Sequence, residues 1–439
     1  MGKETSVPDQ NQQRNSTITI SKRHAAAIVF SILLLPSLVL LAPGAAAQNF
    51  RVLHTFTGGQ DGAYPYAGLV IDKNDNLYGT ANLGGRGSCP PANVGCGTVF
   101  KLVHSKSGWT FQRLYAFRGG NDGQGPYGRV TLRSDGNLYG TTIAGGIQTC
   151  PSGCGTVLEL RPPIASCQVT PCPWTETVLY RFKGNSDGFY PSGDLAFNPA
   201  GNIYGTTTQG GSIGPGTVYE LKPSNGKWSE SIVWSLTGGE DGGNPYSGVI
   251  LDSAGNIFGT AIAGGTNNSG SVFELTSSKS GWTETTLHDF FGVSNGVTPQ
   301  AGLLLDKSGN LIGATEGDGS NHGGTVYSLT ARKGGWSLST IDALPGPGGD
   351  AGPWAKLSMD ATGKLYGTTQ GYPPAGDYGT VFELTHSSSG WKETILHHFT
   401  GGGDGEVPYS TLVFDAKGNL YGTTNLGGSG YGVVFEITP

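Results

Sequence analysis

Charged residues are scarce in this chain of 439 residues, at 13%, and basic residues do not outnumber acidic ones, because the formal net charge is −6. Proteins that grip nucleic acid need a basic surface against the phosphates, so this balance excludes nucleic acid as the partner. The sequence also lacks a His-Glu-x-x-His metal motif and a Walker-type phosphate loop. After position 47, no stretch is long and apolar enough to cross a bilayer. These absences remove several classes of function without pointing to a reaction.

The one long apolar run lies near the start, in "SKRHAAAIVFSILLLPSLVLLAPGAAAQ". A basic flank, an apolar segment and small residues up to Ala47 are typical of an export signal, which we expect to span residues 1–47 and to be cut after Ala47. The run from Ala25 to Ala42 covers 18 residues, so an uncleaved membrane anchor is the alternative. We expect an exported protein, secreted or periplasmic, with no membrane contact after cleavage.

Cysteines are absent from the second half of the chain and form three short-range pairs in the first. Each pair lies in an insertion that the rest of the chain lacks: Cys89 and Cys96, Cys150 and Cys154, Cys167 and Cys172. In an exported chain this pattern favours disulfides. Zinc binding is the alternative, but the spacings are irregular and no histidine accompanies them.

What the chain does contain is a repeated heptapeptide, "GNLYGTT" at 136–142 and six close copies. Marker residues before its Leu or Ile recur every 54 or 55 residues, except for intervals of 61 and 65 at the cysteine insertions: Asn76, Asn137, Asn202, Asn256, Asn310, Lys364 and Asn419. A fixed period predicts an array of structural repeats. Glycine reaches 76 residues while hydrophobic residues hold at 36%, so the glycines are turns between short strands and not a sign of disorder.

Each unit offers four strand candidates, such as "GLVID" (68–72), "LYGTT", "GTVFEL" (379–384) and "WKETILHHF" (391–399). Four antiparallel strands repeated radially form a propeller blade. The last unit stops at its third strand, whereas "NFRVLHTF" (49–56) matches a fourth strand. The sequence therefore predicts an all-β, seven-bladed β-propeller of four-stranded antiparallel blades, closed by the N-terminal strand completing the last blade.

The expected organisation is a signal over 1–47 and a propeller over 48–439. Its blades span 57–117, 118–182, 183–236, 237–290, 291–344, 345–399 and 400–439, with 48–56 as the last strand of blade 7. The aromatic residue of "NLYGT" is expected to fill the space between sheets, and the glycine after it to let the next blade approach. We interpret the tryptophans that open the fourth strands as packing residues.

The combination of "GNLYGTT", a glycine-rich loop and "GTVFEL" resembles the choice-of-anchor tandem repeat GloVer-containing protein family, whose members are exported tandem-repeat proteins, and the resemblance covers the chain after the signal. It implies export and a propeller. It implies no reaction, cofactor or catalytic residue.

The longer loops, before the first strand and after the second, are expected to share one face of the ring, and any site should lie there. An acidic series falls on this face: Asp61, Asp122, Asp187, Asp241 and Asp404, with Asn295 in the fifth unit and Asp350 displaced in the sixth. Asp before Gly commonly holds a turn through its own backbone, which is the favoured interpretation. A ring of carboxylates binding calcium is the alternative; no other cofactor is predicted.

A second series on this face follows a proline: Tyr66, Tyr127, Tyr246, Trp354 and Tyr409, with Ser192 and Gln300 in the remaining units. Aromatic rings at a propeller mouth could stack on sugar rings, or they could pack against neighbouring loops.

A single site in an array should appear where one unit breaks the pattern. At the start of the first strands most units have a small residue, but three have a charge: Arg129, Asp194 and Lys356. The fifth unit places Glu316, Asp318 and His322 in its loop. Such residues could perform acid–base chemistry, although charges in glycine-rich loops are usually only solvated. His54, His288 and His397 recur on the fourth strand, and we interpret them as surface residues.

Taken together, the sequence favours a monomeric, exported binding module for an extracellular polysaccharide or protein over catalysis. The alternative is a carbohydrate-active enzyme, a lyase or hydrolase, with its site on the loop face. A purely structural role is a third interpretation.

Overall fold

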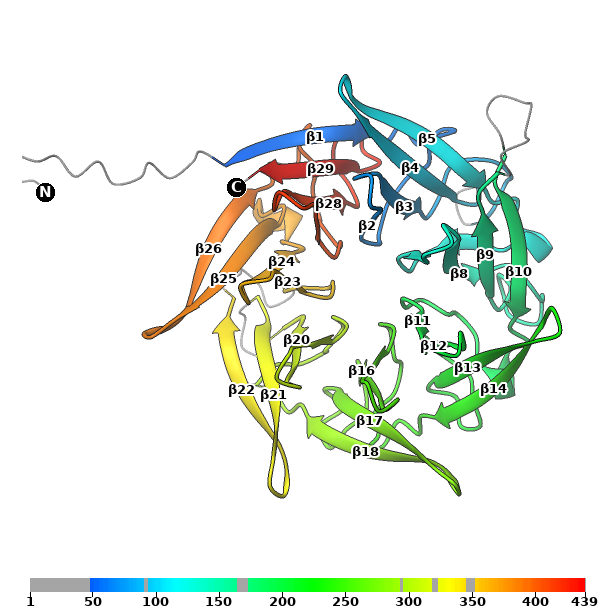
Figure 1. Cartoon of the computed structure of the whole chain (residues 1–439), viewed down its shortest axis with the longest axis vertical. Coiled ribbons are helices and arrows are strands. Elements are labelled where there is room, and N and C mark those ends of the chain that lie inside the picture. Colours follow the sequence, from blue (N-terminus) through cyan, green and yellow to red (C-terminus); the bar gives the residue numbers. More distant parts are fainter. Residues whose placement is uncertain are drawn as a thin grey trace, which may run out of the picture. The chain divides into compact units, whose positions relative to one another are not determined.

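The computed structural model of the chain describes residues 48–90, 94–163, 173–292, 295–317, 323–344 and 352–438. Contacts divide the chain into two units, Met1–Ala46 and Ala47–Pro439. The second unit is built of strands arranged as seven sheets around a central axis (Figure 1). Within the described residues no helix has the length and apolar character of a membrane span. The predicted signal over 1–47 lies outside the described residues.

The strands nearest the axis are only two residues long. They are β2 (Val70–Ile71), β7 (Thr131–Leu132), β11 (Ala196–Phe197), β15 (Ile250–Leu251), β19 (Leu304–Leu305), β23 (Ser358–Met359) and β27 (Val413–Phe414).

The second strands carry the repeated heptapeptide, and most are five residues long and fully buried. They are β3 (Leu77–Ala81), β8 (Leu138–Ala144), β12 (Ile203–Thr207), β16 (Ile257–Ala261), β20 (Leu311–Thr315), β24 (Leu365–Thr369) and β28 (Leu420–Thr424).

The third strands are β4 (Thr98–Ser105), β9 (Thr156–Arg161), β13 (Thr217–Ser224), β17 (Ser271–Ser278), β21 (Thr325–Arg332), β25 (Thr380–Ser387) and β29 (Val433–Thr438). The outermost strands are β5 (Gly108–Ala116), β10 (Thr175–Arg181), β14 (Lys227–Ser235), β18 (Gly281–Asp289), β22 (Gly335–Ala343), β26 (Gly390–His398) and β1 (Asn49–Thr55). Blade 2 has an extra strand, β6 (Gln124–Pro126). Short 3₁₀ turns lie in loops of three blades in the described residues: η1 (Gly120–Asp122), η2 (Asn185–Asp187) and η3 (Pro373–Ala375).

The ring closes as the sequence predicts. The last blade has the order β27-β28-β29-β1, and β1 pairs antiparallel with β29 from Asn49 opposite Thr438 to Thr55 opposite Val433 (Figure 1). β1 therefore covers the backbone edge that β29 would otherwise expose, and an exposed edge of this kind is where sheets aggregate. The predicted seven-bladed propeller and its closure are both confirmed.

The hydrophobic core is divided into seven clusters, one between each pair of neighbouring blades. Between blades 1 and 2, for example, Tyr78 packs with Val99, Leu138 and Leu158. The fourth-strand tryptophan of the next blade contacts the same aromatic position, as in Trp174 against Tyr78 at 6.4 Å between ring centroids. The aromatic residue of the heptapeptide thus fills the seam between blades, as predicted, and the tryptophans pack there as well.

A threonine of the heptapeptide also bonds across the seam. Thr206 Oγ1 donates to the carbonyl oxygen of Ser247 at 2.8 Å, and Thr423 Oγ1 donates to that of Ala67 at 3.0 Å. Each bond joins a second strand to the chain entering the first strand of the next blade. The repeated "YGTT" is therefore explained by contacts between units as much as by contacts within them.

The heptapeptide glycine has a different neighbour from the one predicted. A Cβ placed on Gly79 would lie 2.6 Å from Phe100 Cζ, and Phe100 is its cross-strand partner on β4. The aromatic ring of Phe100, on the third strand, covers the glycine of the same blade. The glycine therefore makes room for this side chain and not for the next blade. Aromatic side chains commonly cover glycines in this way in sheets.

The first strands are also shorter than predicted, two residues in place of five. Close to the axis, neighbouring blades meet backbone to backbone: a Cβ on Gly68 would lie 2.4 Å from the carbonyl oxygen of Thr411 in blade 7. The chain therefore leaves the ladder of its own sheet before the axis, where the next blade occupies the space.

Candidate functional site

The residues that follow the repeated proline gather at the axis. Five aromatic rings from five blades form one continuous arc, in the order Tyr246, Tyr127, Tyr66, Tyr409 and Trp354. The centroid distances along the arc are 5.8, 4.7, 5.6 and 4.6 Å. Ser192 and Gln300, the two non-aromatic members of the series, line the same central channel.

The rings of this arc cover one another. Tyr66 stacks between Tyr127 and Tyr409, at interplanar angles of 24° and 12°. Tyr409 in turn has Trp354 beside it. Tyr66 is thereby stacked on two neighbouring rings, which is the arrangement that the packing interpretation describes. Only Tyr246 and Trp354, at the ends of the arc, have one neighbour each within it.

The loops that carry these rings have an unusual backbone. The residue before the proline has a positive φ in six blades, including the β-branched Thr298 at 55° and Val407 at 55°. Such residues rarely adopt this conformation, so the surrounding structure must impose it. The amide nitrogen of Tyr64 donates to the carbonyl oxygen of Tyr431 in blade 7, and its own carbonyl accepts from Asn82. These two backbone hydrogen bonds hold the loop in place, so that Tyr66, two residues later, lies at the axis.

Burial keeps the hydroxyls of Tyr66, Tyr127 and Tyr409 protonated. It raises the pKa of Tyr127, with the nearby Tyr246 adding to the effect, and it raises the pKa of Tyr409 to about 12. Burial likewise raises the pKa of Tyr66, against a hydrogen bond with Asn425 that lowers it. At neutral pH these side chains are therefore neutral groups able to donate and accept hydrogen bonds.

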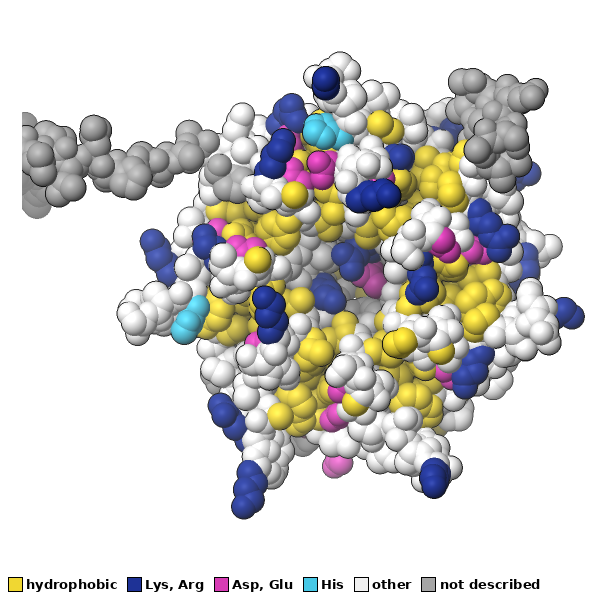
Figure 2. Space-filling view, in the orientation of Figure 1, with side chains coloured by type: hydrophobic (Ala, Val, Ile, Leu, Met, Phe, Trp, Pro, Cys, Tyr) yellow, Lys and Arg dark blue, Asp and Glu magenta, His cyan; other side chains and the backbone are white. Residues whose placement is uncertain are grey.

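Beneath the arc, the three charged residues that break the repeat line one cavity of about 110 Å³. Asp194 accepts hydrogen bonds from Arg129 Nε at 3.1 Å and from the Arg129 backbone nitrogen at 3.0 Å. Lys356 lies close to this pair, and burial together with Arg129 lowers its pKa to about 8. In Figure 2, basic and acidic side chains are visible inside the central hollow of the ring.

A larger cavity of about 700 Å³ opens on the loop face above blades 7, 1, 2 and 3. Tyr66, Ser192 and Tyr246 line both cavities, so the larger one forms a mouth directly over the narrow channel. Two amide atoms of mouth-lining residues, Asn82 Nδ2 and Asn425 Oδ1, are buried and have no hydrogen-bond partner within the described part of the chain.

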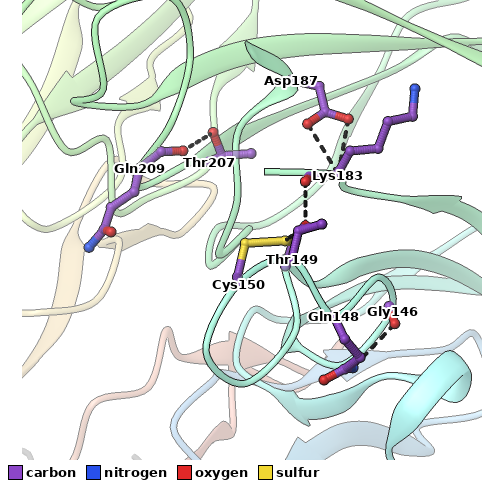
Figure 3. The surroundings of a disulfide bond; sticks show 9 residues. Gly146, Gln148, Thr149, Cys150, Lys183, Asp187, Thr207 and Gln209 are labelled. Carbon is purple, nitrogen blue, oxygen red and sulfur yellow. Dashed lines mark hydrogen bonds between the residues drawn. A yellow bond between two sulfur atoms is a disulfide. The ribbon is translucent and has the colours of Figure 1, made fainter. Parts of the chain in front are cut away.

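The cysteine insertions form part of the wall of this mouth. Cys89 and Cys96 are joined in a disulfide and line the cavity with Pro90, and Ser152 lines it from the second insertion. Cys150 and Cys154 form the second disulfide. Beside it, Thr149 Oγ1 donates to the carbonyl oxygen of Lys183 at 2.5 Å, which ties the insertion to the next blade (Figure 3). Cys167 and Cys172 lie outside the described residues.

The acidic series does not lie at the axis but at the outer seams. Asp187 accepts hydrogen bonds from the Lys183 backbone nitrogen at 3.1 Å and from Tyr180 Oη at 2.7 Å. The other described members repeat this pattern, with the partner side chain seven residues earlier on the fourth strand: Asp61 with His54, Asp122 with Tyr115, Asp241 with Trp234, Asn295 with His288 and Asp404 with His397. These are the contacts of turn-forming residues; Asp350 lies outside the described residues. Calcium binding by this series stays a prediction.

The same contacts correct the interpretation of the histidines. His54 stacks on Phe111 of the next blade at 4.1 Å, and His397 stacks on Phe50 at 3.8 Å. They do lie on outermost strands, but they are partly buried there. The reason is that each fourth strand packs against the fourth strand of the neighbouring blade.

The structure separates the catalytic candidates. Arg129, Asp194 and Lys356 share the channel, whereas Glu316 follows β20 and has its Oε1 3.5 Å from Gln370 Nε2. Asp318 and His322 lie outside the described residues. Within the described ranges, no group of three or more His, Cys, Asp or Glu side chains is placed to hold a metal ion.

A comparison with known protein families matches the Gloeobacter/Verrucomicrobia repeat three times, over residues 41–170, 166–340 and 304–439. The chain belongs to the Gloeobacter/Verrucomicrobia repeat family. No curated protein matches this repeat protein.

Among solved structures, one similar chain is a protein from Thermus thermophilus described provisionally as an oxidoreductase (glucose dehydrogenase). It is 14% identical, with a TM-score of 0.40, covering 71% of this chain and 96% of that one. Another is a protein of unknown function from Dyadobacter fermentans, 12% identical, with a TM-score of 0.42, covering 89% and 98%.

One register position that contributes to the mouth was not recognised as a series in the sequence; of its seven members, only Glu316 was a sequence-based candidate. It is the position directly after the repeated heptapeptide: Asn82, Ile143, Thr208, Ile262, Glu316, Gln370 and Asn425. Four of the seven line the mouth cavity, including Asn82 and Asn425. The signal was available, because this position varies in polarity between repeats whose neighbouring residues are nearly constant.

Proposed function

We propose that this repeat protein is an exported, non-catalytic binding module that takes a saccharide in the mouth of its central channel. The observation that carries the proposal is the mouth cavity itself. It is about 700 Å³, within the range of ligand pockets, and it lies where the cysteine insertions break the sevenfold repeat. The seven repeats build the propeller, and the insertions that interrupt the repeat form part of the wall of this cavity.

The chemistry of the wall suits a ligand rich in hydroxyl groups. Tyr64, Tyr190 and Tyr246 offer aromatic surface with a polar edge, and Asn82 and Asn425 each hold a buried amide atom without a partner. An unsatisfied buried polar atom costs roughly 1–3 kcal/mol, which a hydrogen bond to a ligand hydroxyl would recover if the amide turned toward the cavity. Aromatic walls with amides among them are thus complementary to a sugar, whose ring has apolar faces and a polar rim.

Two disulfides in the insertions, one of them lining the mouth, fit an oxidising compartment, which supports export. An extracellular protein partner and a carbohydrate-active enzyme are the competing functions, and the same experiment separates them. Asp194, a candidate acid or base, is engaged by Arg129 through three hydrogen-bonding contacts to its carboxylate, which supports a positioning role over proton transfer.

The test is calorimetric titration of the isolated protein with a panel of neutral and acidic oligosaccharides, with product analysis of each mixture. We expect at least one oligosaccharide to bind without being cleaved. Asn82→Ala and Tyr246→Ala should each weaken binding by about tenfold, the value of one good contact. The matched control is Gln370→Ala, an amide at the same register position in blade 6 that does not line the mouth. Binding unchanged in both mouth variants would refute the site, and released product would favour the enzyme.

A further inference from the structure

The narrow channel below the mouth carries an unbalanced positive charge. Its charged wall residues are Arg129, Lys356 and Asp194, two cations and one carboxylate. Asp194 is already engaged by Arg129, whose Nη2 and Nε both lie 3.1 Å from Oδ2. The remaining cation, Lys356, has no hydrogen-bond or ion-pair partner within the described part of the chain. This local positive charge is opposite in sign to the net charge of the protein, which is −6.

Neighbouring blades leave room beside this ammonium group. At the register position of Lys356, three other blades have glycine, at Gly68, Gly248 and Gly302. A Cβ on Gly302 would already lie 3.6 Å from Lys356 Cβ and 3.8 Å from its Cδ. Because these three positions carry no side chain, the lysine side chain can extend along the channel wall. A cavity of about 110 Å³ remains there, large enough for a small group but below the usual size of a ligand pocket.

The burial of the lysine calls for an anion. A largely buried ammonium without a hydrogen-bonded counter-ion is unfavourable, and here burial and Arg129 together lower the pKa of Lys356 to about 8, although the nearby carboxylate of Asp194, already paired with Arg129, opposes this shift. The other titratable groups on the channel wall are the tyrosines of the arc, and burial raises the pKa values of Tyr66, Tyr127 and Tyr409, so these groups do not supply a negative charge near neutral pH.

We propose that the saccharide bound in the mouth is acidic, and that its carboxylate enters the channel and pairs with the ammonium group of Lys356. The mouth and the channel share Tyr66, Ser192 and Tyr246 as wall residues, so a group attached to a sugar ring in the mouth lies next to the channel. The sugar ring fits the larger cavity and its carboxylate fits the smaller one. This inference rests on the proposed function and names the class of its ligand, a uronic-acid oligosaccharide.

The experiment compares matched pairs of oligosaccharides that differ only in carboxylate against hydroxymethyl, such as oligogalacturonate and oligogalactose, together with a sulfated oligosaccharide. We expect the wild-type protein to prefer the uronate by tenfold or more at pH 7. Lys356→Met should abolish this preference and leave the affinity for the neutral partner unchanged. Lys356→Arg should retain most of the preference, and Lys417→Met, a substitution of an exposed lysine, should have no effect.

The pH dependence gives a second readout. Raising the pH from 7 to 9 should weaken uronate binding about tenfold, because a lysine with a pKa near 8 loses most of its charge over that interval. The neutral oligosaccharide should show no such change. In Lys356→Met the uronate should lose its pH dependence as well.

The outcomes separate the two proposals. Equal affinity for the neutral and acidic partners, or a preference that survives Lys356→Met, overturns the acidic ligand while the saccharide site stands. A sulfated oligosaccharide that binds with the same Lys356 dependence when the uronate does not overturns the carboxylate assignment. If no oligosaccharide of either charge binds, both proposals fail.

Discussion

The outer seams of the ring and its axis use polar residues in opposite ways. At the seams, six blades repeat one arrangement, in which a loop Asp or Asn accepts from the backbone or side chains of the fourth strand and the chain that follows it, as Asp187 does. At the axis, one register position carries Arg129, Asp194 and Lys356 in three blades and small residues in the others. The paired polar groups of the seams are repeated around the propeller, whereas Lys356, the axial charge without a hydrogen-bond or ion-pair partner in the described residues, occurs in one blade only. In a repeat protein, departures from the pattern therefore indicate function better than the pattern does.

The largest effect on this comparison is expected from a deletion that opens the closed propeller. Deleting Asn49–Phe56 removes β1 and the fully buried Phe56, and exposes the edge of β29. Since truncating a single buried phenylalanine costs about 3–5 kcal/mol, we expect the deletion to lower the free energy of unfolding by more than about 4 kcal/mol. Thermal unfolding followed by circular dichroism measures it.

The matched control begins at Gln48 and keeps β1 intact. If the deletion variant melts at the same temperature as this control, the closure does not hold the ring together.

A smaller effect is expected at one seam. Asp187→Ala leaves the Lys183 amide without its acceptor and Tyr180 Oη with only its longer bond to Glu230 at 3.4 Å, so the free energy of unfolding should fall by about 1–3 kcal/mol. Asp187→Asn should lose less, because Asn295 fills the equivalent position in blade 5. Urea unfolding gives both values, and oligosaccharide affinity should not change in either variant. A loss of affinity without a loss of stability would reverse the roles of seam and axis.

The smallest expected effect is on the pH dependence of stability, which should differ between the seam at Glu230 and the seam at His54. Burial, together with Asp187, raises the pKa of Glu230 to about 7, above its value in the unfolded chain. The folded state then binds the extra proton, so this residue's contribution to stability falls as the pH rises from about 4.5 to 7. Since the side chain is partly exposed, Glu230→Gln should stabilise the protein by only about 1 kcal/mol at pH 8 and not at pH 4.

The histidine seams have the opposite slope. Burial lowers the pKa of His54 below its usual value, although Asp61 opposes the shift. The unfolded chain then binds the proton more readily, so stability at this seam falls as the pH drops below about 6.5. His54→Gln should remove that fall. Melting temperatures of both variants between pH 4 and 8 provide the measurement, and parallel slopes at the two seams would contradict the assignment.

The sequence predicted the loop face and the residues near the axis, but not how those residues meet. Periodicity placed Tyr66, Tyr127 and Tyr409 at equivalent positions, and equivalent positions in a closed ring must converge. Their stacking on one another depends on distances across the axis, which no single repeat contains. The mouth residue Asn82 was missed for a related reason: its register position varies in polarity between repeats, but this variation points to a site only once the loops around it are known to enclose a cavity.

By itself, the sequence determined the number of blades, the strands within each and the closure by β1, because these follow from local patterns repeated seven times and from a fourth strand missing at one end. The tertiary structure alone decided which polar groups are satisfied. Asp61 and Lys356 are both charged residues in one loop-rich sequence, yet Asp61 bonds His54 at a seam while Lys356 faces the channel without a partner within the described residues. Whether a charge has a partner depends on contacts between segments of the chain that only the closed ring brings together.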